Sequence, residues 1–322
     1  MSEYENLLRQ IKSQVPVDES FDLLERKLKI GERDATMFFV DGLVDGDVMQ
    51  RVVASLQELD KKTVDRAKTA GEFMAYNLAF LDCLLASDMK QGIQFLYSGL
   101  IPLLIDGYDQ IIIIDGRDYP LRSVAEPSKE KSLRGAKDGF VEAMMTNIAL
   151  LRRRIRDNAL IFKIYAVGEV TKTDVALAYM KDRADQDMVK KMDQTLKQLR
   201  LRGLTVTEQT LVEALTGKKL SWCNPFPKVR YSQRPDIIAA HVEEGKLAVI
   251  VDNSPTVILL PAGIFDFLQD IDDYYFPLLT GNYFRFLRIL NIFVILFATP
   301  VYLLFAEGDI PVNEALRFFI TE

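Results

Sequence analysis

The sequence GLIPLLIDG at Gly99–Gly107 recurs in pattern as GKLAVIVDN at Gly245–Asn253, and these two stretches decide the fold class. In both, a glycine precedes an aspartate by seven residues, and a second apolar run starts five residues after that aspartate, at Ile111 and at Val257. Asp-Gly or Asp-Asn between β-rich runs favours a tight turn, because these residues tolerate positive φ or bond their own backbone. Each stretch therefore predicts a β-hairpin entered from a helix that ends at the glycine.

The residues upstream of the two hairpins match as well. Thr36–Val40 predicts a strand that leads through Asp45 into a helix, and Ala176–Met180 predicts a strand that leads through Asp185 into another. The chain therefore alternates strands and helices twice in the same order, which is typical of an internal repeat.

This repeat predicts an α/β chain of two similar lobes with mixed sheets. We expect an N-terminal lobe at residues 1–120 and a second lobe at residues 121–280, separated by the polar stretch Asp118–Lys137. Chance similarity of two strand–helix units is the alternative, because the copies agree in pattern more than in identity.

An apolar run near the C-terminus predicts a membrane helix. Ile289–Ala306, with the sequence ILNIFVILFATPVYLLFA, has eighteen residues and no formal charge, which is about the minimum for crossing a bilayer. Arg285 and Arg288 precede it, and basic residues mark the cytoplasmic flank. We therefore expect residues 281–322 to hold a membrane-proximal segment and a first transmembrane helix at about 289–306; a buried core helix is the alternative.

Composition excludes several function classes. Apolar residues make up 49% and charged ones 27%, which predicts folded cores, while a net charge of −6 argues against nucleic-acid binding. Cys83 and Cys223 are too few for a disulfide scaffold and fit a reducing compartment. The single histidine, His241, makes multi-histidine zinc sites and most catalytic triads impossible, and we expect it on a helix surface or packed inside.

A basic run lies on the predicted helix that follows the polar stretch. Arg152, Arg153 and Arg154, with Arg156, can pair bidentately with carboxylates or phosphates, so they are candidates for a subunit interface or for contact with anionic headgroups. The alternative is a solvated helix face, which contributes little to stability. Asn147 lies at the edge of the apolar face of this helix, where its amide would need partners.

Two further motifs predict backbone positioning. Gly135, after Arg134, can supply positive φ, while Pro235 suits the first position of a helix and leaves Arg234 to reach a carboxylate next to Asp236. We favour an intramolecular clamp between the lobes; a small-molecule site between them is the alternative. Neither a P-loop nor a Gly-x-Gly-x-x-Gly motif follows any predicted strand.

The segment before the membrane helix predicts a coupling element. Tyr274 and Tyr275 suit the membrane interface, and Arg285 and Arg288 can anchor headgroups. We expect this segment to transmit a movement of the lobes to the membrane helix.

Several motifs together carry a resemblance. They are Glu126-Pro127, Arg134-Gly135-Ala136-Lys137-Asp138-Gly139-Phe140, Thr146-Asn147, Arg152-Arg153-Arg154-Ile155-Arg156-Asp157, Pro225-Phe226-Pro227, Arg234-Pro235-Asp236, Val251-Asp252-Asn253-Ser254-Pro255 and Asp272-Asp273-Tyr274-Tyr275. In this order the chain resembles the GerA family of spore germination proteins, of the germinant receptor A-subunit type, from about Phe38 to Tyr302, and most of all its stage V sporulation branch. It departs at Ala136 and Gln233, where the family usually has Pro and Glu. Family members continue into further membrane helices, so we expect a fragment or a product without most of the membrane domain.

The resemblance implies a protein of the spore inner membrane, with its N-terminal domain on the cytoplasmic (core) side. It implies a homo-oligomer that works with B- and C-type subunits or related auxiliaries as an ion channel or receptor component and promotes cation release during germination. We expect no cofactor. The alternative is a membrane-tethered small-molecule-binding or scaffolding module without pore activity. An enzyme is disfavoured by the single histidine and by the lack of a nucleophile motif or a metal cluster.

Overall fold

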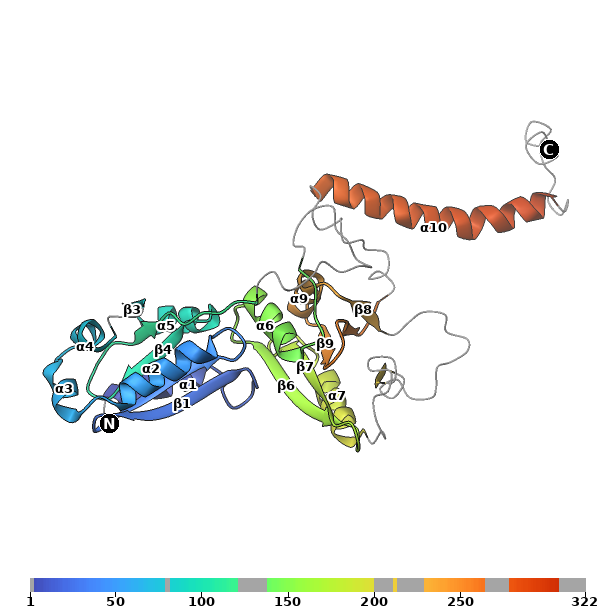
Figure 1. Cartoon of the computed structure of the whole chain (residues 1–322). Helices are drawn as coiled ribbons and strands as arrows, with labels where there is room; N and C mark the ends of the chain where they lie inside the picture. Colours follow the sequence, from blue (N-terminus) through green and yellow to red (C-terminus); the bar gives the residue numbers. More distant parts are fainter. Residues whose placement is uncertain are drawn as a thin grey trace. The chain divides into compact units, whose positions relative to one another are not determined.

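Two five-stranded sheets with the helices that cover them, and one long C-terminal helix, make up the part of the chain that the computed structural model describes (Figure 1). This part covers residues 3–78, 82–120, 138–199, 211–212, 229–263 and 278–306. Both sheets belong to one compact unit, Met1–Lys131 with Lys137–Ala262, and the C-terminal helix belongs to a second unit.

The first sheet has the order β1-β2-β4-β5-β3, and every neighbouring pair in it is antiparallel. Its strands are β1 Leu23–Ile30, β2 Arg33–Val40, β3 Cys83–Leu85, β4 Ile101–Ile105 and β5 Ile112–Ile114. The central strands β4 and β5 are buried throughout, since helices cover both faces.

Five helices cover the first sheet. They are α1 Glu3–Gln14, α2 Gly46–Gln57, α3 Lys61–Arg66, α4 Ala70–Asn77 and α5 Met89–Tyr97. Ile11 of α1 and Leu96 of α5 share one apolar core, whereas Val52 of α2, Val64 of α3 and Phe73 of α4 share the other. We call this sheet with α1–α5 the first lobe.

The second sheet repeats the first. Its order is β6-β7-β9-β10-β8, again antiparallel at each pair. The strands are β6 Leu160–Val167, β7 Thr173–Met180, β8 Arg230–Ser232, β9 Leu247–Val251 and β10 Val257–Leu260, and the helices are α6 Met144–Arg154, α7 Gln186–Gln198 and α9 Pro235–Glu243. Most buried apolar residues of α6 and α9 pack into one core and those of α7 into another, on opposite faces of the sheet. We call these elements the second lobe.

The predicted repeat is confirmed in its details. Both predicted hairpins form, as β4–β5 and β9–β10, and the glycines that precede them have positive φ, +82° at Gly99 and +96° at Gly245. The two aspartates act as N-caps at equivalent places: Asp45 accepts from backbone N–H groups of α2, and Asp185 accepts from those of α7.

The structure differs from the sequence-based expectation in three respects. All described strand pairs are antiparallel rather than mixed, because the helices after β2 and β7 bring the chain back to the end where those strands stop. The basic helix begins at Met144, and so does not follow directly on the polar stretch that ends at Lys137. The edge strands β1 and β6 were not anticipated, since the charged sequence LLERKLKI of β1 resembles a helix as much as a strand.

The C-terminal unit contributes α10, Leu278–Ala306, with Pro300 inside it. Its stretch Asn282–Leu304 has a mean hydropathy of 2.0, and no part of its most apolar window is buried against other residues of the chain. By length and composition this helix can cross a membrane.

Candidate functional site

The first arginine of the basic run lies inside the molecule. Arg152 and Asp22 form an ion pair in which both side chains have zero exposure, with Nε 2.6 Å from Oδ2 and Nη2 3.0 Å from Oδ1. Arg152 belongs to α6 of the second lobe, and Asp22 immediately precedes β1 of the first. The pair is therefore a bidentate, fully desolvated contact between the lobes. With zero exposure, the Arg152 side chain does not lie on a solvated helix face.

The remaining donors and acceptors of the pair are satisfied locally. Arg152 also donates to the backbone oxygens of Asp157 (3.0 Å) and Leu160 (2.9 Å). On the other side, Ser20 Oγ donates to Asp22 Oδ1 at 2.6 Å and accepts from the backbone N–H of Phe162 at 3.0 Å. This network offsets the desolvation that makes an isolated buried charge so costly.

Aromatic rings enclose the guanidinium. Its Cζ lies 5.1 Å from the ring centroid of Phe162 and 5.5 Å from that of Tyr97, which is at the end of α5 in the first lobe. Burial raises the pKa of the Tyr97 hydroxyl, which makes no hydrogen bond within the described part of the chain. The guanidinium therefore combines its ion pair with contacts to two aromatic rings.

Weaker contacts surround this buried pair. Phe21 N donates to Phe162 O at 2.9 Å, and Asn158 Nδ2 donates to Gln14 O at 3.1 Å. Lys181 and Glu19 form a second ion pair between the lobes at 2.6 Å, but their side chains are 55% and 48% exposed. The two lobes thus meet through a desolvated centre and a solvated rim.

The other arginines of the run have separate partners. Arg153 lies over the Tyr119 ring, 4.6 Å from its centroid, and Arg154 pairs with Asp138 at 2.5 Å. The exposed Arg156 donates to Ser98 Oγ at 3.2 Å. The four arginines therefore do not form one continuous patch.

Two polar residues fix the start of α6. The amide of Asn147, fully buried, accepts from the backbone N–H of Val141 at 2.8 Å and donates to its carbonyl at 2.6 Å. Asp252, in the β9–β10 turn, accepts from the backbone N–H of Met144 at 3.2 Å. Both motif residues thus support the helix that carries Arg152.

The Arg-Pro-Asp motif forms the N-terminus of α9. Arg234 is the N-cap residue and is buried, Pro235 is the first helical residue, and Asp236 pairs with Arg234 at 2.6 Å. Phe140 N donates to Gln233 O at 2.8 Å, so this end of α9 is tied to the segment that leads into α6. The predicted role of Arg234 as a clamp between lobes stays a prediction.

His241 is buried on α9, as a packed histidine. Its Nδ1 lies 3.1 Å from Glu244 Oε2 and 3.2 Å from Lys246 Nζ, and its Nε2 lies 3.2 Å from Arg230 Nη1. Burial lowers its pKa, and the charges of Lys246 and Arg230 lower it further.

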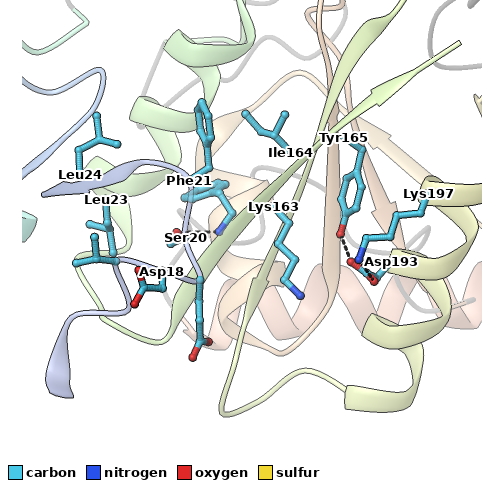
Figure 2. A pocket seen from close by; sticks show the side chains of 13 residues that line it. Asp18, Ser20, Phe21, Leu23, Leu24, Lys163, Ile164, Tyr165, Asp193 and Lys197 are labelled. Carbon is cyan, nitrogen blue, oxygen red and sulfur yellow. Dashed lines mark hydrogen bonds and ion pairs between the residues drawn. The ribbon is translucent and has the colours of Figure 1, made fainter. Parts of the chain in front are cut away.

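An open groove of about 590 Å³ runs between the lobes beside the buried pair (Figure 2). One wall is the chain from Val17 to Leu24, and the other is β6 with α7. On the α7 side, Tyr165 donates to Asp193 at 2.6 Å and Lys197 pairs with the same carboxylate at 2.8 Å. Burial by itself would raise the pKa of Asp193, but these hydrogen bonds hold it below its usual value.

Six predicted residues remain. Arg285 and Arg288 lie on α10. Arg134, Gly135, Tyr274 and Tyr275 lie outside the described residues. Among the residues described, no three side chains of metal-ligating types come together.

No sequence motif indicated Asp22 or Ser20. Asp22 lies between Phe21 and Leu23, where an aspartate is more typical of an exposed turn, and its partner is 130 residues away in sequence. Recognition of β1 as a strand would have indicated Asp22, because Asp22 lies directly before β1, at the place that corresponds to the start of β6 in the second lobe.

The comparison with known proteins identifies the class. The model of the Bacillus/Clostridium GerA spore germination protein family matches residues 9–319, so this chain belongs to the GerA family. The solved N-terminal domain of the A subunit of the Bacillus megaterium spore germinant receptor GerK3 has a similar structure, with a TM-score of 0.59 and 27% identity over 80% of this chain and 94% of that one.

Two relatives from Bacillus subtilis (strain 168) are similar in sequence. Stage V sporulation protein AF is 34% identical over 95% of this chain and 62% of its own length. Spore germination protein KA is 29% identical over 89% of this chain and 52% of its own length. The chain therefore spans between about half and three-fifths of these relatives.

Proposed function

We propose that this chain provides the cytoplasmic domain and the first membrane helix of a subunit in a germination complex of the spore inner membrane. In this role the subunit assembles with further copies and with B- and C-type subunits or related auxiliaries, and the assembly promotes cation release. The role is not enzymatic.

The observation that carries the proposal is the apolar stretch Asn282–Leu304, which follows a unit of germinant-receptor fold. Apolar side chains such as Phe293, Ile295 and Leu296 are more than half exposed along it. A helix of this kind needs lipid or other helices around it. Family membership supports a receptor component in a spore membrane.

The charges on either side of the uncharged run Ile289–Ala306 support the orientation. Arg285 and Arg288 precede the uncharged run, whereas Glu307 and Asp309 follow it. Basic residues favour the cytoplasmic side, so the two lobes would face the spore core. One helix cannot enclose a pore, which is why the channel role requires several copies or further helices.

Reconstitution tests the proposal. The full-length protein is placed in potassium-loaded vesicles with its partner subunits, and efflux is compared with that of vesicles holding a form cut before Leu278. We expect efflux from the first sample alone. Arg285→Ala with Arg288→Ala should reduce it if the segment couples the lobes to the helix. Equal efflux from both samples would exclude a channel built on this helix.

The groove between the lobes supports a second candidate, a membrane-tethered module that binds a small molecule or serves as a scaffold without pore activity. Thermal unfolding of the full-length protein in detergent is measured against a panel of spore metabolites. Two results together would favour this candidate over the channel: a rise in Tm that depends on the metabolite concentration, and intact vesicles that release no potassium.

A further inference from the structure

The outer edge of β6 has backbone groups that bind nothing in the described part of the chain. Among the described strands, β6 pairs with β7 alone, and the bond from Lys181 N to Ala159 O shows which residues of β6 bond to β7. Odd-numbered residues of β6 therefore bond to β7, and even-numbered ones direct their N–H and C=O away from it. On this outer side, Phe162 accepts from Phe21 N and donates to Ser20 Oγ, but the backbone groups of Ile164 and Ala166 bond to no residue that the structure describes.

The corresponding edge of the first sheet is protected, and that of β6 is not. β1 has the sequence LLERKLKI, in which Glu25, Arg26, Lys27 and Lys29 give the edge a dense set of charges. Charged side chains of this kind discourage strand addition. β6 has the sequence LIFKIYAV, and Lys163 is its only charge.

The groove gives this open edge room for a further strand. Figure 2 shows Phe21 and Leu24 on the wall that faces β6, and their side chains are 44% and 37% exposed. Lys163 projects between the walls (Figure 2); it forms no ion pair with any described residue, and its Nζ lies 5.8 Å from the centroid of the Tyr179 ring. Asp193, the nearest acid of α7, is already held by Tyr165 and Lys197.

We propose that this groove receives an extended segment of a partner polypeptide, which adds to β6 as a sixth strand. The segment bonds to the backbone of Ile164 and Ala166, places apolar side chains against Phe21 and Leu24, and sets an acidic side chain beside Lys163. Main-chain bonds supply most of the affinity in such strand addition, and side-chain pockets supply the specificity. The inference does not depend on the channel role.

The backbone contribution is tested with Ala166→Pro. Proline removes an N–H that points away from β7, so the sheet keeps its own bonds while strand addition is blocked. Lys27→Pro is the matched control, because the bond from Asp41 N to Asp22 O shows that Lys27 N–H points away from β2. The thermal unfolding of both variants is measured to establish that each is folded.

The probe is a fluorescent, N-acetylated peptide, Thr-Val-Glu-Val-Thr, titrated into the full chain in detergent micelles and followed by anisotropy. We expect saturable binding to the wild type and to Lys27→Pro, and loss of binding to Ala166→Pro. A peptide N-methylated at alternate amides should not bind, which tests the backbone bonds even if Ala166→Pro fails to fold. Hydrogen exchange at Ile164 and Ala166 should slow when the probe binds.

The side-chain contribution is tested by exchanging charges. The Glu peptide should bind the wild type roughly two- to fivefold more tightly than its Lys counterpart, and Lys163→Glu should reverse this preference. The proposal is overturned if the Glu peptide does not bind at about 1 mM. Equal binding of the N-methylated peptide, or of a folded Ala166→Pro, would also overturn it.

Discussion

Removing the side chain of Asp22 should lower the free energy of unfolding more than removing any exposed acidic side chain at the lobe interface. In Asp22→Ala the guanidinium of Arg152 stays at zero exposure but loses its bonds at 2.6 and 3.0 Å, and Ser20 Oγ loses its acceptor. Breaking a buried pair on one side costs about 3–5 kcal/mol, because a charge is left uncompensated. We expect this loss in the free energy of unfolding, measured by urea denaturation of residues 1–262 at pH 7.

The matched control is Glu19→Ala, which breaks the exposed pair between the same lobes. It should cost less than about 1 kcal/mol, because solvent already screens that pair. A double variant, Asp22→Leu with Arg152→Met, removes both charges and should recover most of the loss. If Asp22→Ala costs no more than Glu19→Ala, the buried pair does not hold the lobes together.

Two further predictions concern the second lobe. Asn147→Leu should lower the free energy of unfolding by about 1–3 kcal/mol, because the backbone N–H and C=O of Val141 lose their partner; an unchanged urea midpoint would contradict this. His241 has a lowered pKa in the folded protein, so the histidine of the unfolded chain binds a proton first as the pH falls. Below about pH 6.5 the free energy of unfolding should therefore decrease, by at most about 1.4 kcal/mol per pH unit, until the folded-state pKa is reached. Denaturation at pH 7.5 and 5.5 should show this slope in the wild type and not in His241→Gln.

The repeat was predictable because its signals are local. Glycine at a helix end and aspartate in a turn or at a cap act within a few residues, and Gly99, Gly245, Asp45 and Asp185 have the expected roles. The apolar runs of β4 and β9 can be recognised as buried strands from their composition alone. Sequence reasoning is most reliable where the cause of a structure lies within the segment itself.

The candidate site was harder to predict because its causes are distant. A run of four basic residues in five, such as Arg152–Arg156, is usually solvated, and only the position of Asp22 in the other lobe explains why Arg152 is buried. The groove depends on how β6 and the chain before β1 meet, which no local pattern records. Sequence motifs indicated the residues of the second lobe that form the site, but not the residues of the first lobe that they contact.

The place of α6 has a consequence for synthesis on the ribosome. Ala149 of this helix packs in a core of the first lobe and lies close to Gly42, yet α6 follows that lobe in the chain. While the first lobe emerges from the ribosome, Arg152 has not yet been synthesised or is still in the exit tunnel, so Asp22 lacks its ion-pair partner. The apolar surface that Ala149 covers in the folded protein is then exposed to solvent. We therefore expect chaperones to bind the nascent first lobe until residues 144–154 leave the exit tunnel. The last folding step of this lobe should coincide with the emergence of Arg152.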